Sequence, residues 1–157
     1  MDAIQFEDAV RRHQGLLYHI AYTMLRSPQD CADAVQEALM LAWRHRGSLR
    51  DEGAFRPWLS RILVNVCKSA LRARKRLPTT DLGDAPDTAQ ADDQALHDAI
   101  QALPTDLRVP VVLFYLEGFS IRETANALRI PSGTVKSRLS RARGRLGALL
   151  VSEEGEA

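Results

Sequence analysis

The chain has 157 residues, of which 45% are hydrophobic and 26% charged, a composition that suits a globular core and excludes a disordered protein. Its formal net charge of +1 hides a segregation, because residues 1–76 carry +5, residues 77–93 carry −5 and residues 94–157 carry +1. This pattern indicates that the two outer blocks, and not the acidic strip between them, meet a polyanion.

The first half of the chain predicts three helical segments, the first of them either one helix or a pair of helices, because apolar residues recur there at helical spacing. Ser27-Pro28 ends the first, and a polar loop over residues 47–53, with a glycine at each end, precedes the third. Trp43 is expected in the buried stripe of the second. The helices are expected over residues 5–26 (with a candidate joint at Gly15), 30–45 and 54–75.

Two of these helices have a polar face that is a candidate binding surface. On the second helix the free face carries Asp33, Gln36 and Glu37. On the third, three cations and one amide recur at i, i+4, i+7 and i+11. A solvated surface is the plain alternative for the polar stripe of the third helix. The polar residues of the third helix are Arg61, Asn65, Lys68 and Arg72.

Residues 77–93 lack periodicity and contain two prolines and five aspartates without a single Lys or Arg, so we expect a flexible acidic linker there. Beyond it, helices are predicted over residues 93–103 and 106–117, with Pro110 in the first turn of the latter. No strand pattern occurs. The predicted fold class is therefore all-α, with two small helical domains, 1–76 and 94–151, joined by the linker 77–93.

The stretch 120–150 predicts a helix-turn-helix, which would lie in the second domain. Ser120 and Glu123 have the S-x-x-E spacing of a capping box, which starts a helix at the next residue. Pro131 ends that helix, and Ser132 is the expected N-cap of a second one.

The free face of this last helix is cationic, with five basic residues and no acid between Lys136 and Arg145. Soluble helices usually intersperse both signs, so the bias favours a nucleic-acid interface over a solvated face. The major groove admits one helix, and arginine can address both a guanine edge and a phosphate.

Both halves carry longer motifs. In the first half they are DAVQEAL (33–39), AWR (42–44), FRPWL (55–59) and Arg61-Ile62 to Asn65; in the second they are LP (103–104), DLR (106–108), YLEG (115–118) and IPSGTVKSRLSRAR (130–143). Together they resemble a bacterial RNA polymerase sigma factor of the extracytoplasmic-function (ECF) group, which keeps only sigma regions 2 and 4. The chain departs from the family at Ser140, where many members carry a bulkier residue.

The resemblance implies a sigma factor that binds core RNA polymerase and directs promoter recognition, local melting and initiation, with no cofactor and no metal. The implied partners are the coiled coil of the largest polymerase subunit, the flap of the second-largest subunit, promoter DNA and an anti-sigma factor. Residues that match polymerase-binding positions are Asp33, Gln36 and Glu37.

The resemblance also implies two DNA sites. Asn65 matches a position that reads a flipped base of the minus-ten element, where loop 47–53 would help to form the pocket and neighbouring cations would hold the single strand. These cations are Arg61, Lys68 and Arg72. Residues matched to the minus-thirty-five element are Lys136, Ser137, Arg138 and Arg141, with Thr134 and Arg143 closer to phosphate.

Two other functions compete with a sigma factor. A stand-alone helix-turn-helix regulator explains the second domain and leaves the first unexplained. A sigma-like decoy that sequesters an anti-sigma factor has no need of the basic face. An enzyme is disfavoured because no nucleophile-base spacing or phosphate loop occurs and the four histidines lie on separate segments. These histidines are His13, His19, His45 and His97.

Cysteine usage and hydropathy bear on the compartment. Cys31 and Cys67 lack the spacing of a zinc site, so we expect reduced, buried thiols. The N-terminus lacks the basic and apolar regions of a signal peptide, and the longest apolar run, 111–116, is too short to span a bilayer. A cytoplasmic protein without membrane contact is therefore expected.

Overall fold

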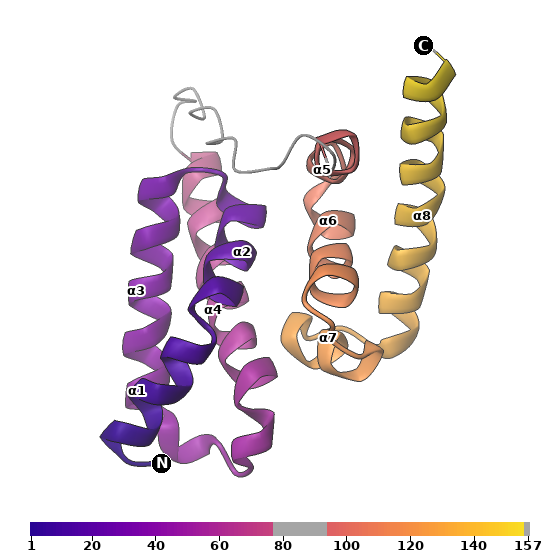
Figure 1. The fold of residues 1–157 in the computed structure, drawn as a ribbon. Helices are drawn as coiled ribbons and strands as arrows, with labels where there is room; N and C mark the ends of the chain where they lie inside the picture. Colours follow the sequence, from indigo (N-terminus) through magenta and orange to yellow (C-terminus); the bar gives the residue numbers. More distant parts are fainter. Residues whose placement is uncertain (77–93, 156–157) are drawn as a thin grey trace. The chain divides into compact units, whose positions relative to one another are not determined.

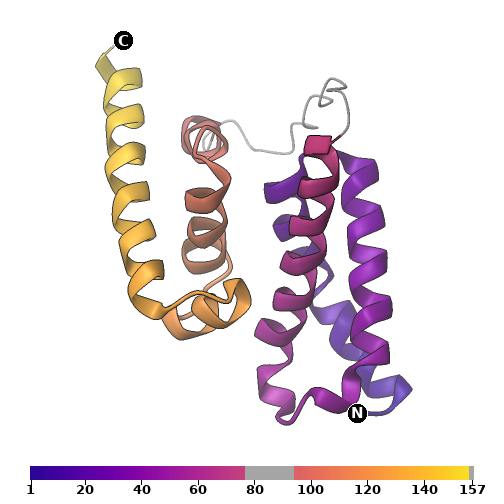
Figure 2. The ribbon, with the colours of Figure 1, turned by 180° about the vertical axis from the view of Figure 1, so that it is seen from behind.

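The structure is a computed structural model that describes residues 1–76 and 94–155, with side chains described up to residue 148. Within these residues every regular element is helical (Figures 1 and 2), which confirms the predicted all-α class. The chain divides into two units, one with α1 to α4 and the other with α5, α6, the start of α7, and α8. The predicted linker, 77–93, lies outside the described residues.

The first unit contains four α-helices, α1 (Ala3–Arg12), α2 (Gln14–Leu25), α3 (Pro28–Arg44) and α4 (Phe55–Arg76). Two short 3-10 turns, η1 (Arg46–Ser48) and η2 (Glu52–Ala54), occupy the predicted loop. The candidate joint at Gly15 is wrong, because the chain bends at His13, with φ −112° and ψ 10°. Gly15 is an ordinary helical residue, and the bend lets the next two residues, Leu16 and Leu17, enter the core.

Helices α2, α3 and α4 pack together lengthwise to form the core of this unit (Figure 1). On α3, Ala34, Ala38 and Ala42 recur every four residues and are buried, so small side chains let the neighbouring helices approach closely. Trp43 was expected in this stripe and is instead 38% exposed. The guanidinium of Arg46 lies 3.7 Å from the centroid of the indole ring, and the ring of Phe6 meets the indole edge to face at 5.2 Å.

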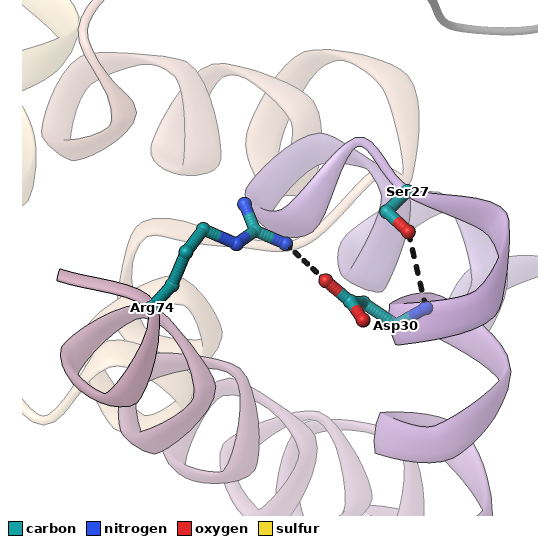
Figure 3. A network of polar contacts seen from close by, with 3 residues as sticks. All are labelled: Ser27, Asp30 and Arg74. Atoms are coloured by element: carbon teal, nitrogen blue, oxygen red, sulfur yellow. Dashed lines mark hydrogen bonds and ion pairs between the residues drawn. The ribbon is translucent and has the colours of Figure 1, made fainter. Parts of the chain in front are cut away.

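A small polar network joins the N-terminus of α3 to the last turns of α4 (Figure 3). The Ser27 hydroxyl caps α3 by accepting from the backbone N–H of Asp30 at 3.3 Å. The Asp30 carboxylate pairs with the guanidinium of Arg74. Each charge also lies at the helix end that its sign favours, and the pair links the two helices.

The second unit contains α5 (Gln94–Gln101), α6 (Thr105–Val111), a π-helical turn η4 (Val112–Leu116), the start of α7 (Ile121–Leu128) and α8 (Ser132–Gly155). The expectation that Pro110 lies in a first turn is wrong, because α6 begins at Thr105 and encloses Pro110. Beyond this proline the backbone widens, and the Glu117 N–H donates to the carbonyl of Val112 at 2.9 Å.

A buried arginine closes the corner between α5 and α6. Arg108 is 5% exposed and donates to the carbonyl of Leu103 at 2.9 Å, to that of Gln101 at 3.3 Å and to the hydroxyl of Thr105 at 3.1 Å. These carbonyls end α5, where intrahelical partners are missing. The charge is therefore buried with hydrogen bonds, which keeps its desolvation tolerable.

One of the two predicted helix caps is confirmed and the other is wrong. The Ser120 hydroxyl accepts from the Glu123 N–H and the Glu123 carboxylate accepts from the Ser120 N–H, each at 3.0 Å. At α8, Ser132 is already the first helical residue. The carbonyl of Pro131 accepts from the N–H of Thr134 at 3.0 Å, so the chain enters α8 through the proline.

The two serines therefore differ in their expected effect on stability. Ser120→Ala removes one half of the capping box and should lower the free energy of unfolding by about 0.5 to 2 kcal/mol. Ser132→Ala is the matched control, because its hydroxyl is not the cap, and it should change the free energy by less than about 0.5 kcal/mol. Urea denaturation of the full chain measures both, and equal losses would contradict the assignment of the caps.

Candidate nucleic-acid interface

The orientation of α8 is set by one buried stripe. Val135 and Ala142 are 0% exposed, Leu139 is 2% exposed, and all three pack in the core cluster of the second unit with Leu146 against it. This confirms the apolar face that the sequence predicts for these four residues, whereas the fifth predicted position, Leu149, lies outside the described side chains. Most of the remaining circumference of α8 is exposed.

The free circumference has small residues in its middle and cations on both sides. At 3.6 residues per turn, Ser137, Ser140 and Gly144 lie opposite the buried stripe. One flank carries Thr134, Arg138 and Arg145, and the other carries Lys136 and Arg143, while Arg141 lies next to Ser137. A helix of about 10 to 12 Å diameter enters a groove of about 12 Å most deeply when its leading edge is small.

The predicted residues of α8 do not all lie on one face. Lys136, Ser137, Arg141 and Arg143 are exposed, whereas Thr134 and Arg138 are half-buried. Arg141 leans toward Ser137, with its Nη2 at 3.4 Å from the hydroxyl. Arg143 turns the other way and donates from Nη1 to the hydroxyl of Tyr115 at 2.8 Å. The sequence places Tyr115 in the YLEG motif, but no local signal links it to Arg143, which lies 28 residues later.

In the first unit the predicted face of α3 is open. Asp33, Gln36 and Glu37 are all exposed, and Met40, one turn on, is 59% exposed. The Gln29 amide donates to the Asp33 carboxylate at 3.1 Å, so that carboxylate already has one partner on the preceding turn. An acidic and amide surface around an exposed methionine is of the kind that binds a basic protein helix.

The predicted polar stripe of α4 is present. Arg61, Asn65 and Lys68 are half-buried, and Arg72 is exposed and donates to the hydroxyl of Ser69 at 3.2 Å. Their spacing places all four on one side of the helix. The amide is therefore flanked by cations along the helix axis, as the sequence indicates.

A pocket of about 260 Å³ lies between α3 and α4 and includes Asn65. Asn65 of α4 and Glu37 of α3 both line it, although the sequence assigns Glu37 to the polymerase-binding face. The loop 47–53, expected to help form a pocket for a base, contributes none of the residues that line this one. The full lining is Glu37, Leu41 and His45 from α3 and Ile62, Asn65, Val66 and Ser69 from α4.

The thiols take no part in these surfaces. Cys31 and Cys67 are free and buried, and burial raises the pKa of Cys31 to about 11 and that of Cys67 to about 12. Both therefore stay protonated near neutral pH and are poor nucleophiles and metal ligands. The described residues hold no cluster of three His, Cys, Asp or Glu side chains fit for a metal ion. No helix among them is long and apolar enough to cross a bilayer.

Two family models match the chain. Residues 9–77 match sigma-70 region 2, and residues 93–146 match sigma-70 region 4. The first match contains the α3 face and the α4 stripe, and the second contains α8 up to residue 146.

Curated relatives and solved structures agree with these matches. The chain is 41% identical over 154 residues to the ECF RNA polymerase sigma factor SigM of Mycobacterium tuberculosis, a match that covers 95% of this chain and 79% of SigM. It is 35% identical to the RNA polymerase sigma-E factor of Streptomyces coelicolor, covering 99% and 92%. A similar structure is the sigma factor RpoE of Bartonella quintana in complex with the anti-sigma factor NepR, at a TM-score of 0.79, 29% identity and coverage of 93% and 96%. Another is CnrH in complex with the cytosolic domain of CnrY, at a TM-score of 0.71, 27% identity and coverage of 96% and 90%.

Proposed function

The chain belongs to the ECF group of RNA polymerase sigma factors, and from that premise we propose that it directs core polymerase to a specific set of promoters. It is a transcription initiation factor that recognises promoter DNA, assists local melting and has no enzymatic activity of its own. The observation that carries the proposal is the cationic free face of α8, with small residues at its centre, in one chain with the open acidic face of α3. We place the protein in the cytoplasm, where its polymerase partner acts.

The two units are proposed to divide the work. Residues 1–76 form the region 2 domain, which binds polymerase and the minus-ten element, and residues 94–151 form the region 4 domain, which binds the minus-thirty-five element. Residues 77–93 join them as a linker. A linker of this length, at most about 55 to 60 Å when extended, lets the domains occupy separate promoter elements.

The protein partners follow from the exposed surfaces. Asp33, Gln36 and Glu37 are proposed to bind the coiled coil of the largest polymerase subunit, since their charge and exposure suit a basic helix. The region 4 domain would bind the flap of the second-largest subunit. An anti-sigma factor is a further proposed partner, by analogy with the Bartonella quintana complex.

In the minus-ten element, Asn65 is proposed to read one unpaired base. An amide offers both a donor and an acceptor to a Watson-Crick edge, and Leu41 and Ile62 supply apolar walls in the same pocket. The cations of the α4 stripe, Arg61, Lys68 and Arg72, are proposed to hold the single-strand backbone without sequence preference.

In the minus-thirty-five element, the middle of the free face of α8 is proposed to approach base edges. Ser137 and Arg141 lie nearest that middle, with Lys136 and Arg138 beside them, and Thr134 and Arg143 are proposed to lie closer to phosphate. Because the side chain of Ser140 is small, it would let the free face of α8 approach the base edges closely.

The proposal is tested by run-off transcription with core polymerase over a library of random promoters. We expect transcripts that require both the chain and core polymerase, from templates enriched for two short elements. If the chain alone bound promoter DNA with high affinity in a gel-shift assay, a stand-alone regulator would be supported instead. An absence of any chain-dependent transcript, together with tight binding to an anti-sigma factor, would support a decoy.

Reversing the charge of Glu37 should weaken polymerase binding. Glu37→Lys places a cation opposite the basic surface that we expect on the polymerase. Because like charges repel, the affinity for core polymerase should fall by more than about tenfold. Asp8→Lys, an exposed reversal on α1, is the control and should bind as the parent does. Fluorescence titration measures both, and circular dichroism checks that they remain folded. Equal affinity of Glu37→Lys and the parent would contradict the assignment.

Asn65→Ala should affect base preference, whereas Lys68→Ala should weaken all promoters alike. Loss of the amide removes the donor and acceptor that discriminate one base, so promoter opening should fall and preference at that position should relax. Permanganate footprinting on single-base variants of the minus-ten element reports both effects. If the footprints and the preference of Asn65→Ala match those of the parent, Asn65 does not read a base.

Arg141 can contact a base edge or a phosphate, and the two differ in measurable ways. A bidentate contact to guanine predicts that Arg141→Ala costs about 1 to 3 kcal/mol at one base pair and relaxes discrimination there. A phosphate contact predicts a uniform loss and a smaller salt dependence. Holoenzyme affinities for single-base variants of the upstream element, at two salt concentrations, separate the two. A loss of equal size for every variant refutes base reading by Arg141.

A further inference from the structure

One exposed tyrosine of the second unit is linked to α8 by a hydrogen bond to which the proposed function gives no role. Nη1 of Arg143 donates to the hydroxyl of Tyr115 at 2.8 Å. Tyr115 is 48% exposed on the π-helical turn, and Arg143 is exposed on α8. Both polar groups can therefore reach a ligand from solvent while they remain bonded to each other.

The phenol ring has a fixed support. The ring of Phe114 meets that of Tyr115 edge to face at 4.9 Å, and Phe114 itself packs against the core of the unit. The turn beneath is closed by the Phe119 N–H, which donates to the carbonyl of Leu113 at 2.9 Å. Because the support is part of the core, Tyr115 holds Arg143 more than Arg143 holds Tyr115.

The pair retains several donors. A phenol that accepts a hydrogen bond keeps its own O–H to donate, and a guanidinium has five N–H groups, of which the bond to Tyr115 uses one. The bond to a cation also polarises the phenol and strengthens it as a donor. One O–H and several N–H donors around a positive charge match the oxygens of a phosphate.

We propose that Tyr115 and Arg143 form a clamp for one backbone phosphate of the promoter duplex, with Tyr115 as the positioning residue for Arg143. The inference rests on the proposed function, which supplies the duplex. Lys136 lies on the same flank of α8, seven residues earlier and about 10 Å along the axis. The flank therefore carries two cations in line along the helix axis, which suits a DNA strand better than it suits a single free phosphate ion.

The bond to Tyr115 reduces the entropy that Arg143 loses when it binds the promoter duplex. A free arginine loses rotamer freedom when it binds, and an arginine already held by a hydroxyl loses less. Removing only the hydroxyl should therefore weaken the phosphate contact although the charge remains.

Tyr115→Phe tests this, because it keeps the ring and its packing on Phe114. The affinity of the holoenzyme for its promoter should fall about 2- to 10-fold, by the same factor for every single-base variant of the upstream element. In an Arg143→Ala background the same change should cost almost nothing, and Arg143→Ala alone should lower the salt slope by about one. Tyr18→Phe is the control, since Tyr18 is also exposed, and it should bind as the parent does.

A second readout identifies the ligand. Replacing upstream phosphates one at a time by neutral methylphosphonates should reveal one position that matters to the parent and much less to Tyr115→Phe and Arg143→Ala. Unchanged affinity of Tyr115→Phe, or an equal cost in both backgrounds, overturns the clamp and leaves the sigma-factor proposal standing. A parent chain that gives no core-dependent promoter binding overturns the proposed function and the clamp with it.

Discussion

The burial of one stripe of α8 is the constraint on which the function of the second unit depends. Val135, Leu139 and Ala142 fill the core, so the helix cannot rotate without placing an arginine among apolar side chains, and an unpaired buried charge is costly. The same constraint leaves Ser137 and Gly144 at the leading edge and cations on both flanks. Small residues between two flanks of cations suit a groove whose edges are lined by phosphates. The core determines that this side of α8 faces solvent.

In the first unit the comparable constraint is the packing of α3 against α4. Small alanines on α3 let the two helices approach closely, and the ion pair of Asp30 and Arg74 links the N-terminus of α3 to the last turns of α4. Glu37 then lies both on the free face of α3 and in the wall of the pocket that contains Asn65. Polymerase binding and base reading are thus proposed to use the same pair of helices. Glu37 borders both surfaces, so a polymerase contact at Glu37 would lie close to the base pocket.

The sequence predicted what depends on local patterns and missed what depends on distant contacts. The capping box at Ser120 and the buried stripe of α8 were predictable because their residues lie within a few turns of each other. Trp43 was misplaced because apolarity alone does not show that Arg46 covers the ring. The cap at Ser132 was wrong because Pro131 supplies a carbonyl, which no residue preference reveals.

The candidate site shows the same division. Each polar face was visible in the sequence as a periodic pattern, whereas the pocket shared by Glu37 and Asn65, and the bond between Tyr115 and Arg143, each join residues 28 positions apart. Such pairs are set by how whole helices pack. Tyr115 belongs to the YLEG motif, but the motif does not show that its hydroxyl contacts α8, which only the packing of the helices reveals.

The most direct test of the account is a side-by-side selection from one random promoter library by holoenzymes that contain the parent, Asn65→Ala or Arg141→Ala. If each unit reads its own element, the Asn65 variant will relax preference only in the element nearer the transcription start, and the Arg141 variant only in the upstream element. Shifts in both elements by either variant, or transcripts that do not require the chain, would contradict the division of function between the two units.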